Sequence, residues 1–160
     1  MANKSIEGRK TRLDSLQKKI EEKKSCLGQL EQTKSEAREQ RMALEDLRDQ
    51  MDDSAANTLQ SEINEVYEHV SEEGKELSAE MAGDITELDS LQAETQESLE
   101  AAKEAQASER QLIDSAKKNG IIIPESQNIG QNITENVTLL EDIKMKMQEA
   151  SEISRKLDML

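Results

Sequence analysis

His69 is the only histidine in the 160-residue chain, and it lies among acidic residues that could share chemistry with it. Within about one turn of it, if the segment is helical, lie Glu65, Glu68, Glu72 and Glu73. Histidine and carboxylates can bind a metal ion together, but zinc sites use several His or Cys ligands at defined spacings, which this sequence lacks. We therefore interpret His69 as an ordinary surface residue and expect no metal site.

Cys26 is the only cysteine, so the chain cannot form an intramolecular disulfide. A thiol nucleophile needs an adjacent base, and the sequence shows no recognisable partner for this one. The neighbouring carboxylates at 52–53 and 72–73 would point in different directions on a helix, which argues against an acid/base pair. Glycine-rich phosphate loops and nucleophile elbows are also missing. We predict that the protein is not an enzyme and uses no cofactor and no small-molecule substrate.

Two segments, residues 132–134 and 136–138, match the N-glycosylation sequon. The N-terminal residues lack the apolar segment of a secretory signal peptide, so we interpret both matches as coincidental. No apolar run approaches the about 20 residues that a membrane-spanning helix needs. The sequence predicts a cytoplasmic protein without membrane insertion, and leaves signal-independent export open.

The composition favours long helices over an ordinary globular core. Charged residues make up 35% of the chain and aromatic residues 1%, with Tyr67 as the only Phe, Tyr or Trp. Burial must therefore come from aliphatic side chains along narrow seams. Disorder is the alternative for such a charged chain, but the sustained helical periodicity favours helix.

The net charge of -14 is concentrated in the middle of the chain. Residues 51–116 carry 3 basic and 18 acidic side chains, whereas residues 1–50 carry 12 basic and 10 acidic ones. An acidic surface repels nucleic acid and anionic lipid, so we expect no nucleic-acid partner. The acidic segment would suit a basic partner, or it is simply a solvated helix face.

Residues 58–118 predict one long amphipathic helix, because apolar side chains recur there every three or four positions without a proline. An extra four-residue step in this rhythm near Gly83 predicts a kink in a continuous helix, with a break as the alternative. The stripe consists of Leu59, Ile63, Val66, Val70, Leu77, Met81, Ile85, Leu88 and Leu91.

A first helix is predicted over residues 5–52, with Ser5 as its N-cap. Its apolar seam weakens in the middle, where Lys23, Lys34 and Arg41 occupy core positions of the heptad pattern. Residues 52–57 predict a turn, and Asn57 with the following glutamine resembles a capping box. The alternative is a single helix that runs straight through, because apolar residues keep a spacing of four across this segment.

A third helix is predicted over residues 126–158, after an extended link at 119–125. Gly120 predicts a C-cap of the central helix, and Pro124 restricts the residue before it to extended conformations. The three isoleucines before the proline form either a docking element or a strap across a helix pair. The stripe of the third helix includes Ile133, Val137, Leu140, Ile143 and Met147.

The sequence thus predicts one elongated all-α domain over residues 1–160, a helical hairpin or coiled-coil bundle of three long helices. Its apolar stripes exceed what a hairpin and a return helix can bury, so we expect a non-enzymatic interaction protein of adaptor, chaperone or targeting type that pairs with a helical partner chain. The alternative is a self-assembling structural coiled coil, a homo-oligomer. The expected partner-binding residues are Leu59, Ile63, Val66, Val70, Leu77, Met81, Ile85, Leu88, Ile121, Ile122, Ile123, Ile133, Val137, Leu140 and Met147.

In architecture, a small helical hairpin without a signal peptide resembles the helical partner proteins of type VII secretion, which pair with a secreted toxin or substrate. The W-x-G turn of that family is missing here, since the chain has no Trp. Its Y-x-x-x-D/E signal is missing too, because Ser71 lies four residues after Tyr67. No functional residue is carried over from that family.

Overall fold

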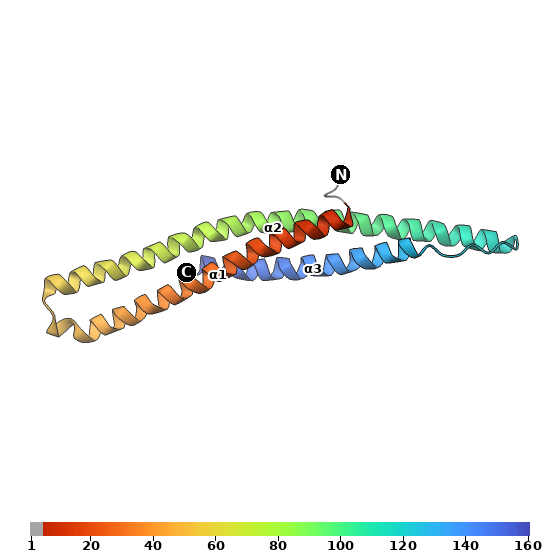
Figure 1. Ribbon diagram of the computed structural model, residues 1–160. Helices are drawn as coiled ribbons and strands as arrows, with labels where there is room; N and C mark the ends of the chain where they lie inside the picture. Colours follow the sequence, from red (N-terminus) through yellow and green to blue (C-terminus); the bar gives the residue numbers. More distant parts are fainter. Residues whose placement is uncertain (1–4) are drawn as a thin grey trace. The chain divides into compact units, whose positions relative to one another are not determined.

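The computed structural model describes residues 5–160, which form three long α-helices and no strand. The helices are α1 (Ile6–Leu47), α2 (Asp53–Lys118) and α3 (Gln127–Asp158), and a short 3₁₀ helix, η2 (Arg48–Gln50), follows α1 (Figure 1). The predicted all-α fold of three long helices is therefore confirmed.

The predicted start of α1 is confirmed, whereas the predicted turn after it is placed too late. The backbone N–H of Gly8 donates to Ser5 Oγ at 3.0 Å, which is the expected N-cap. The chain turns at Met51, whose backbone is extended, and α2 begins at Asp53 instead of residue 58. Asn57 therefore lies inside α2 and does not cap it. Ala56 explains the early start, because alanine favours helix and this one is 1% exposed in the hairpin core.

The other end of α2 agrees with the prediction. The helix continues without interruption through Gly83, so the alternative of a break there is wrong. It ends at Lys118, and Gly120 adopts a positive φ of 80°. The N–H of Ile121 then donates to the Ala116 carbonyl at 2.8 Å, which is the hydrogen bond of a glycine C-cap. The link to α3 follows.

Residue contacts divide the chain into two compact units, each built from parts of all three helices. The first unit comprises the chain up to Gln17 and Thr86–Gln148. The second comprises Lys18–Ile85 and Glu149–Leu160. The prediction of a single domain stays a prediction.

A polar group ties the three helices of the first unit together. Arg9 of α1 is 2% exposed and donates to Asn136 Oδ1 of α3 at 2.8 Å and to Ser98 Oγ of α2 at 3.0 Å. Burial lowers the pKa of the Arg9 guanidinium from its ordinary value, and the nearby Glu94 carboxylate acts in the opposite direction. The buried apolar side chains of the first unit include Leu13, Leu88, Leu91, Leu139 and Ile143.

In the second unit, α1 and α2 form a hairpin that closes at the 3₁₀ turn, where the ribbon changes from orange to yellow in Figure 1. Lys23, predicted to weaken the seam of α1, is buried and forms an ion pair with Asp84 of α2 at 2.6 Å. The end of α3 packs on the same hairpin, where Ser78 and Ser154 share a hydrogen bond of 3.0 Å. The positive charge of Lys23 in the seam of α1 is thus paired with the negative charge of Asp84 on α2.

Gly74 lets the end of α3 approach α2 closely in the second unit. A Cβ at this position would lie 2.6 Å from the carbonyl oxygen of Leu157, which is backbone and cannot rotate away. We expect Gly74→Ala to lower the free energy of unfolding by about 1–3 kcal/mol, because the two helices must separate to admit the methyl group. Urea denaturation followed by circular dichroism measures the change.

Gly83→Ala is the matched control for this substitution on the same helix. No atom of a neighbouring side chain or helix lies within 4 Å of its Cβ position. Alanine there should raise stability by up to about 1 kcal/mol, since it favours helix more than glycine does. Effects of the same sign and size at both positions would contradict the close approach at Gly74.

Candidate partner-binding surface

The hairpin of the second unit carries an apolar groove near its closed end, which we call the hairpin groove. It encloses about 520 Å³ between α1 and α2, with Gln40 and Glu62 at its polar rim. Leu47 is 50% exposed and Leu59 is 40% exposed, although both are large apolar side chains. The apolar lining includes Leu44, Leu47, Met51, Leu59, Ile63 and Val66.

Helical spacing on both sides builds the hairpin groove. Along α1 the lining residues fall at positions 40, 43, 44 and 47, and along α2 at 59, 62, 63 and 66. Each set follows the i, i+3, i+4, i+7 spacing of a single helix face. Leu44, Ala56 and Ile63 form a buried cluster between the two helices, and Leu44 and Ile63 also line the groove.

Within residues 5–160, α3 does not extend as far as the hairpin groove. The last described residue, Leu160, accepts a hydrogen bond from Lys34 at its backbone oxygen, at 3.0 Å, and lies 3.1 Å from the Cβ position of Gly74. From there to the turn, only α1 and α2 pack against each other among the described residues. Two helices cannot enclose their shared seam on all sides, so its outer residues stay exposed.

The expected partner-binding residues fall into three groups by burial. Ile63, Val70, Met81, Leu88 and Leu140 are buried in the cores of their units. These side chains pack inside the protein and offer little surface to a partner. The half-buried group comprises Val66, Leu77, Ile85, Ile123, Ile133 and Met147, and the exposed group comprises Leu59, Ile121, Ile122 and Val137.

Of these residues, the hairpin groove brings together only Leu59, Ile63 and Val66. Leu44, Leu47 and Met51 complete its lining and were absent from the expected set. A signal for them existed, because their spacing restores the apolar seam of α1 after the polar positions in its middle. That spacing identifies groove residues only when the turn at Met51 is known, because the turn folds the end of α1 back onto the start of α2.

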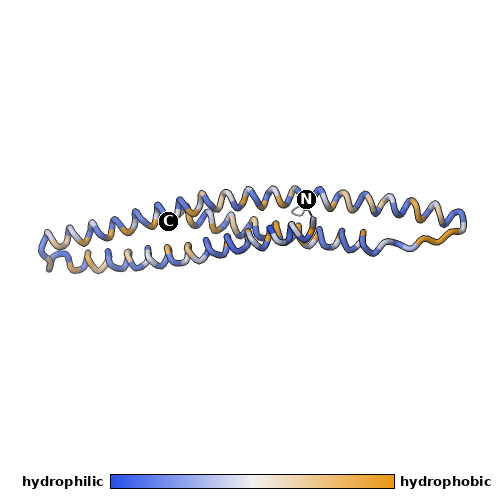
Figure 2. Tube along the Cα trace, turned by 45° about the horizontal axis from the view of Figure 1, so that its top comes forward, coloured by the Kyte–Doolittle hydropathy of each residue, from blue (hydrophilic) through white to orange (hydrophobic). Residues whose placement is uncertain are grey.

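The isoleucine run lies in the link between α2 and α3, in the first unit. Ile122 is 90% exposed and Ile121 is 57% exposed. Part of the link appears as an orange segment in the hydropathy tube of Figure 2. The run is therefore an exposed apolar segment.

Two of the residues considered for chemistry, Cys26 and His69, line the same hollow of about 390 Å³ between α1 and α2. His69 lies on the surface and contacts Glu73 at 3.5 Å, one helical turn away. Cys26 is a free, half-buried thiol. Among residues 5–160, no three or more His, Cys, Asp or Glu side chains are grouped so that they could hold a metal ion.

Comparison of the chain with protein-family models, curated proteins and solved structures finds no match. Across the described part of the chain, no helix combines the length and the hydrophobicity needed to cross a membrane. What the protein can bind is therefore inferred from its own surfaces.

Proposed function

We propose that the protein is a non-enzymatic interaction protein that receives an amphipathic helix of a partner chain in the hairpin groove. The observation that carries this proposal is the open apolar seam where only α1 and α2 pack, with Leu47 and Leu59 half exposed. Elsewhere in the second unit, the end of α3 covers the seam between α1 and α2. Laying an apolar helix face into a groove is also a recurrent mode of recognition.

The charges around the hairpin groove indicate the kind of helix that fits it. Glu62 lies at the rim, and residues 51–116 carry 18 acidic and 3 basic side chains. A partner helix with an apolar face flanked by Lys or Arg would complement this surface and would associate faster at low salt. Adaptors, chaperones and targeting factors bind helices in this way. A small helical partner of a type VII-like secreted toxin or substrate belongs to the same class.

Site-specific photo-crosslinking in the cell of origin tests the proposal. A photoreactive amino acid at position 59 should give a discrete adduct with one other protein, and Leu47→Glu should abolish that adduct by placing a charge in the groove. The matched control carries the photoreactive residue at Met42, which is 58% exposed and does not line the groove. It should give no such adduct.

Two outcomes would contradict the proposal. The same set of adducts from positions 42 and 59 would mean that contact at the groove is non-specific. An adduct between two copies of this chain, together with a discrete homo-oligomer in light scattering, would favour the self-assembling coiled coil instead. Circular dichroism of Leu47→Glu should show unchanged helix content, because surface substitutions usually change stability by at most about 0.5 kcal/mol.

A further inference from the structure

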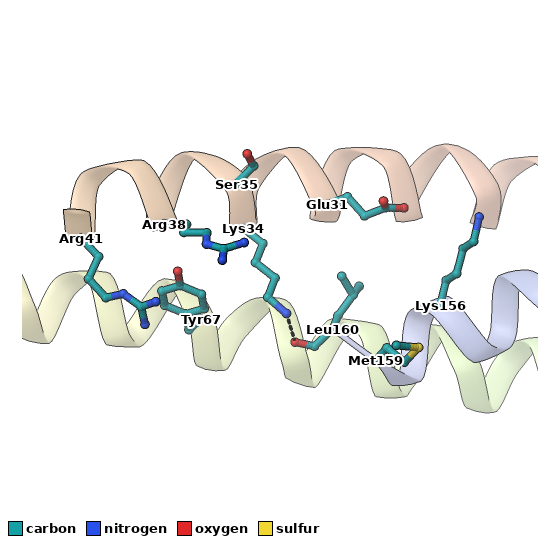
Figure 3. A pocket seen from close by; sticks show the side chains of 9 residues that line it. All are labelled: Glu31, Lys34, Ser35, Arg38, Arg41, Tyr67, Lys156, Met159 and Leu160. Atoms are coloured by element: carbon teal, nitrogen blue, oxygen red, sulfur yellow. Dashed lines mark hydrogen bonds between the residues drawn. The ribbon is translucent and has the colours of Figure 1, made fainter. Parts of the chain in front are cut away.

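A second hollow on the hairpin of the second unit, which we call the cationic pocket, differs in chemistry from the hairpin groove and shares no lining residue with it. It encloses about 490 Å³ between α1, α2 and the end of α3 (Figure 3). Lys34, Arg38, Arg41 and Lys156 line it, and Glu31 is the only acidic side chain among its lining residues. This concentration of positive charge occurs in a chain whose net charge is -14.

Most of these cations lack an anionic partner. Arg38 has no ion pair or hydrogen bond within residues 5–160, and Lys34 donates to the backbone oxygen of Leu160. Arg41 lies over the ring of Tyr67, 5.1 Å from the ring centre. Lys156 is within 3.9 Å of Glu152, one turn away on the same helix. Like charges that converge without a counter-charge repel one another, and a bound anion relieves that repulsion.

Tyr67 provides an independent observation that indicates a ligand. Its hydroxyl oxygen is buried and has no hydrogen-bond partner among the described residues. In Figure 3 the hydroxyl points toward α1, beside the side chains of Arg38 and Arg41. A buried hydroxyl without a partner costs about 1–3 kcal/mol, and native proteins rarely leave one unsatisfied without a reason.

We propose that the cationic pocket binds a phosphate group. A phosphate monoester carries about -1.5 to -2 charges and three acceptor oxygens, which matches several cations better than one carboxylate does. The Arg38 guanidinium can donate two parallel hydrogen bonds to such a group. Lys34 and Lys156 add positive charge, and the Tyr67 hydroxyl donates to a further oxygen. The same chemistry is supplied by free phosphate and by a phosphorylated small molecule.

Tyr67 is also the reporter for the test, because the chain has no Trp and no other Tyr. Inorganic phosphate, titrated at constant ionic strength, should change the tyrosine fluorescence of the full chain saturably. Arg38→Gln should weaken the apparent affinity at least about tenfold, as expected for loss of a charge-assisted pair. Lys24→Gln is the matched control, since Lys24 lies on the same helix, has an exposed side chain and does not line the pocket. It should bind as the wild type does.

A parallel titration with O-phosphoserine distinguishes a phosphorylated small molecule from free phosphate as the ligand. A titration with citrate distinguishes a phosphate site from a carboxylate site. Tighter binding of O-phosphoserine than of phosphate would assign the site to phosphorylated small molecules, and the reverse order to free phosphate. Equal affinity for citrate and phosphate would overturn the proposal in favour of a carboxylate site. No saturable signal, or equal affinities of wild type and Arg38→Gln, would also overturn it.

Thermal unfolding provides a second measurement that does not depend on the fluorescence of Tyr67. Phosphate that binds only the folded chain raises the melting temperature. Tyr67→Phe should fold at least as stably as wild type without phosphate, because it removes an unsatisfied hydroxyl, and should gain less from added phosphate. A loss of stability in Tyr67→Phe without phosphate would contradict the assigned role of the hydroxyl.

Discussion

Replacing Lys23 with methionine is expected to lower the free energy of unfolding by about 3–5 kcal/mol, the cost of breaking a buried ion pair from one side. Lys23 and Asp84 lie 2.6 Å apart, with their side chains only 11% and 9% exposed. The substitution keeps most of the side-chain volume but leaves the Asp84 carboxylate in the core without its counter-charge. Urea denaturation followed by circular dichroism measures the loss.

The double variant Lys23→Met, Asp84→Leu is the control for this prediction. It replaces both charges with apolar groups of similar size, which often leaves stability unchanged or higher. Recovery of most of the lost stability would show that the cost comes from the orphaned carboxylate. A double variant as unstable as Lys23→Met would indicate a packing defect and would contradict the explanation.

Arg9→Ala is the second substitution with a large expected effect, again about 3–5 kcal/mol. It removes a side chain that is 2% exposed, leaves a cavity, and removes the guanidinium that donates to Asn136 Oδ1 and Ser98 Oγ. Because these partners lie on α3 and α2, the loss should loosen all three helices of the first unit. Hydrogen exchange should therefore increase around Ser98 and Asn136.

Lys10→Ala is the matched control next to it on α1. The Lys10 side chain is 42% exposed and lies 3.8 Å from Glu7 in a surface ion pair. Such pairs contribute at most about 1 kcal/mol, so its removal should change stability little. Similar effects at positions 9 and 10 would show that the buried network does not stabilise the first unit.

Local signals predicted much of the fold. Ser5 and Gly120 mark helix ends through hydrogen bonds between near neighbours, and both were identified correctly. The predicted turn at residues 52–57 was placed too late, because this segment combines polar residues that favour turns with Ala55 and Ala56, which favour helix. Burial of Ala56 against Leu44 and Ile63 determines the outcome, and no local pattern contains that contact.

The sites depend on contacts between distant residues, which periodicity does not reveal. The heptad pattern placed Lys23 in the seam, but its partner Asp84 lies 61 residues away. Arg9 was not singled out, because only the assembled helices show that it is enclosed. The cationic pocket combines residues of α1, α2 and α3 that follow no shared spacing. The apolar stripe of α2 could not show which of its residues stay exposed, since that depends on which of them the other helices cover.

The bond between Arg9 and Asn136 joins residues 127 positions apart, and that between Lys34 and Leu160 joins residues 126 positions apart. Synthesis at about 5–20 residues per second separates the appearance of such partners by about 6–25 seconds. During that interval, the side chains that will be buried in the folded protein lack the partners against which they pack. Neither unit can be completed before α3 leaves the ribosome, so a chaperone that shields the nascent α1 and α2 should raise the yield of folded protein.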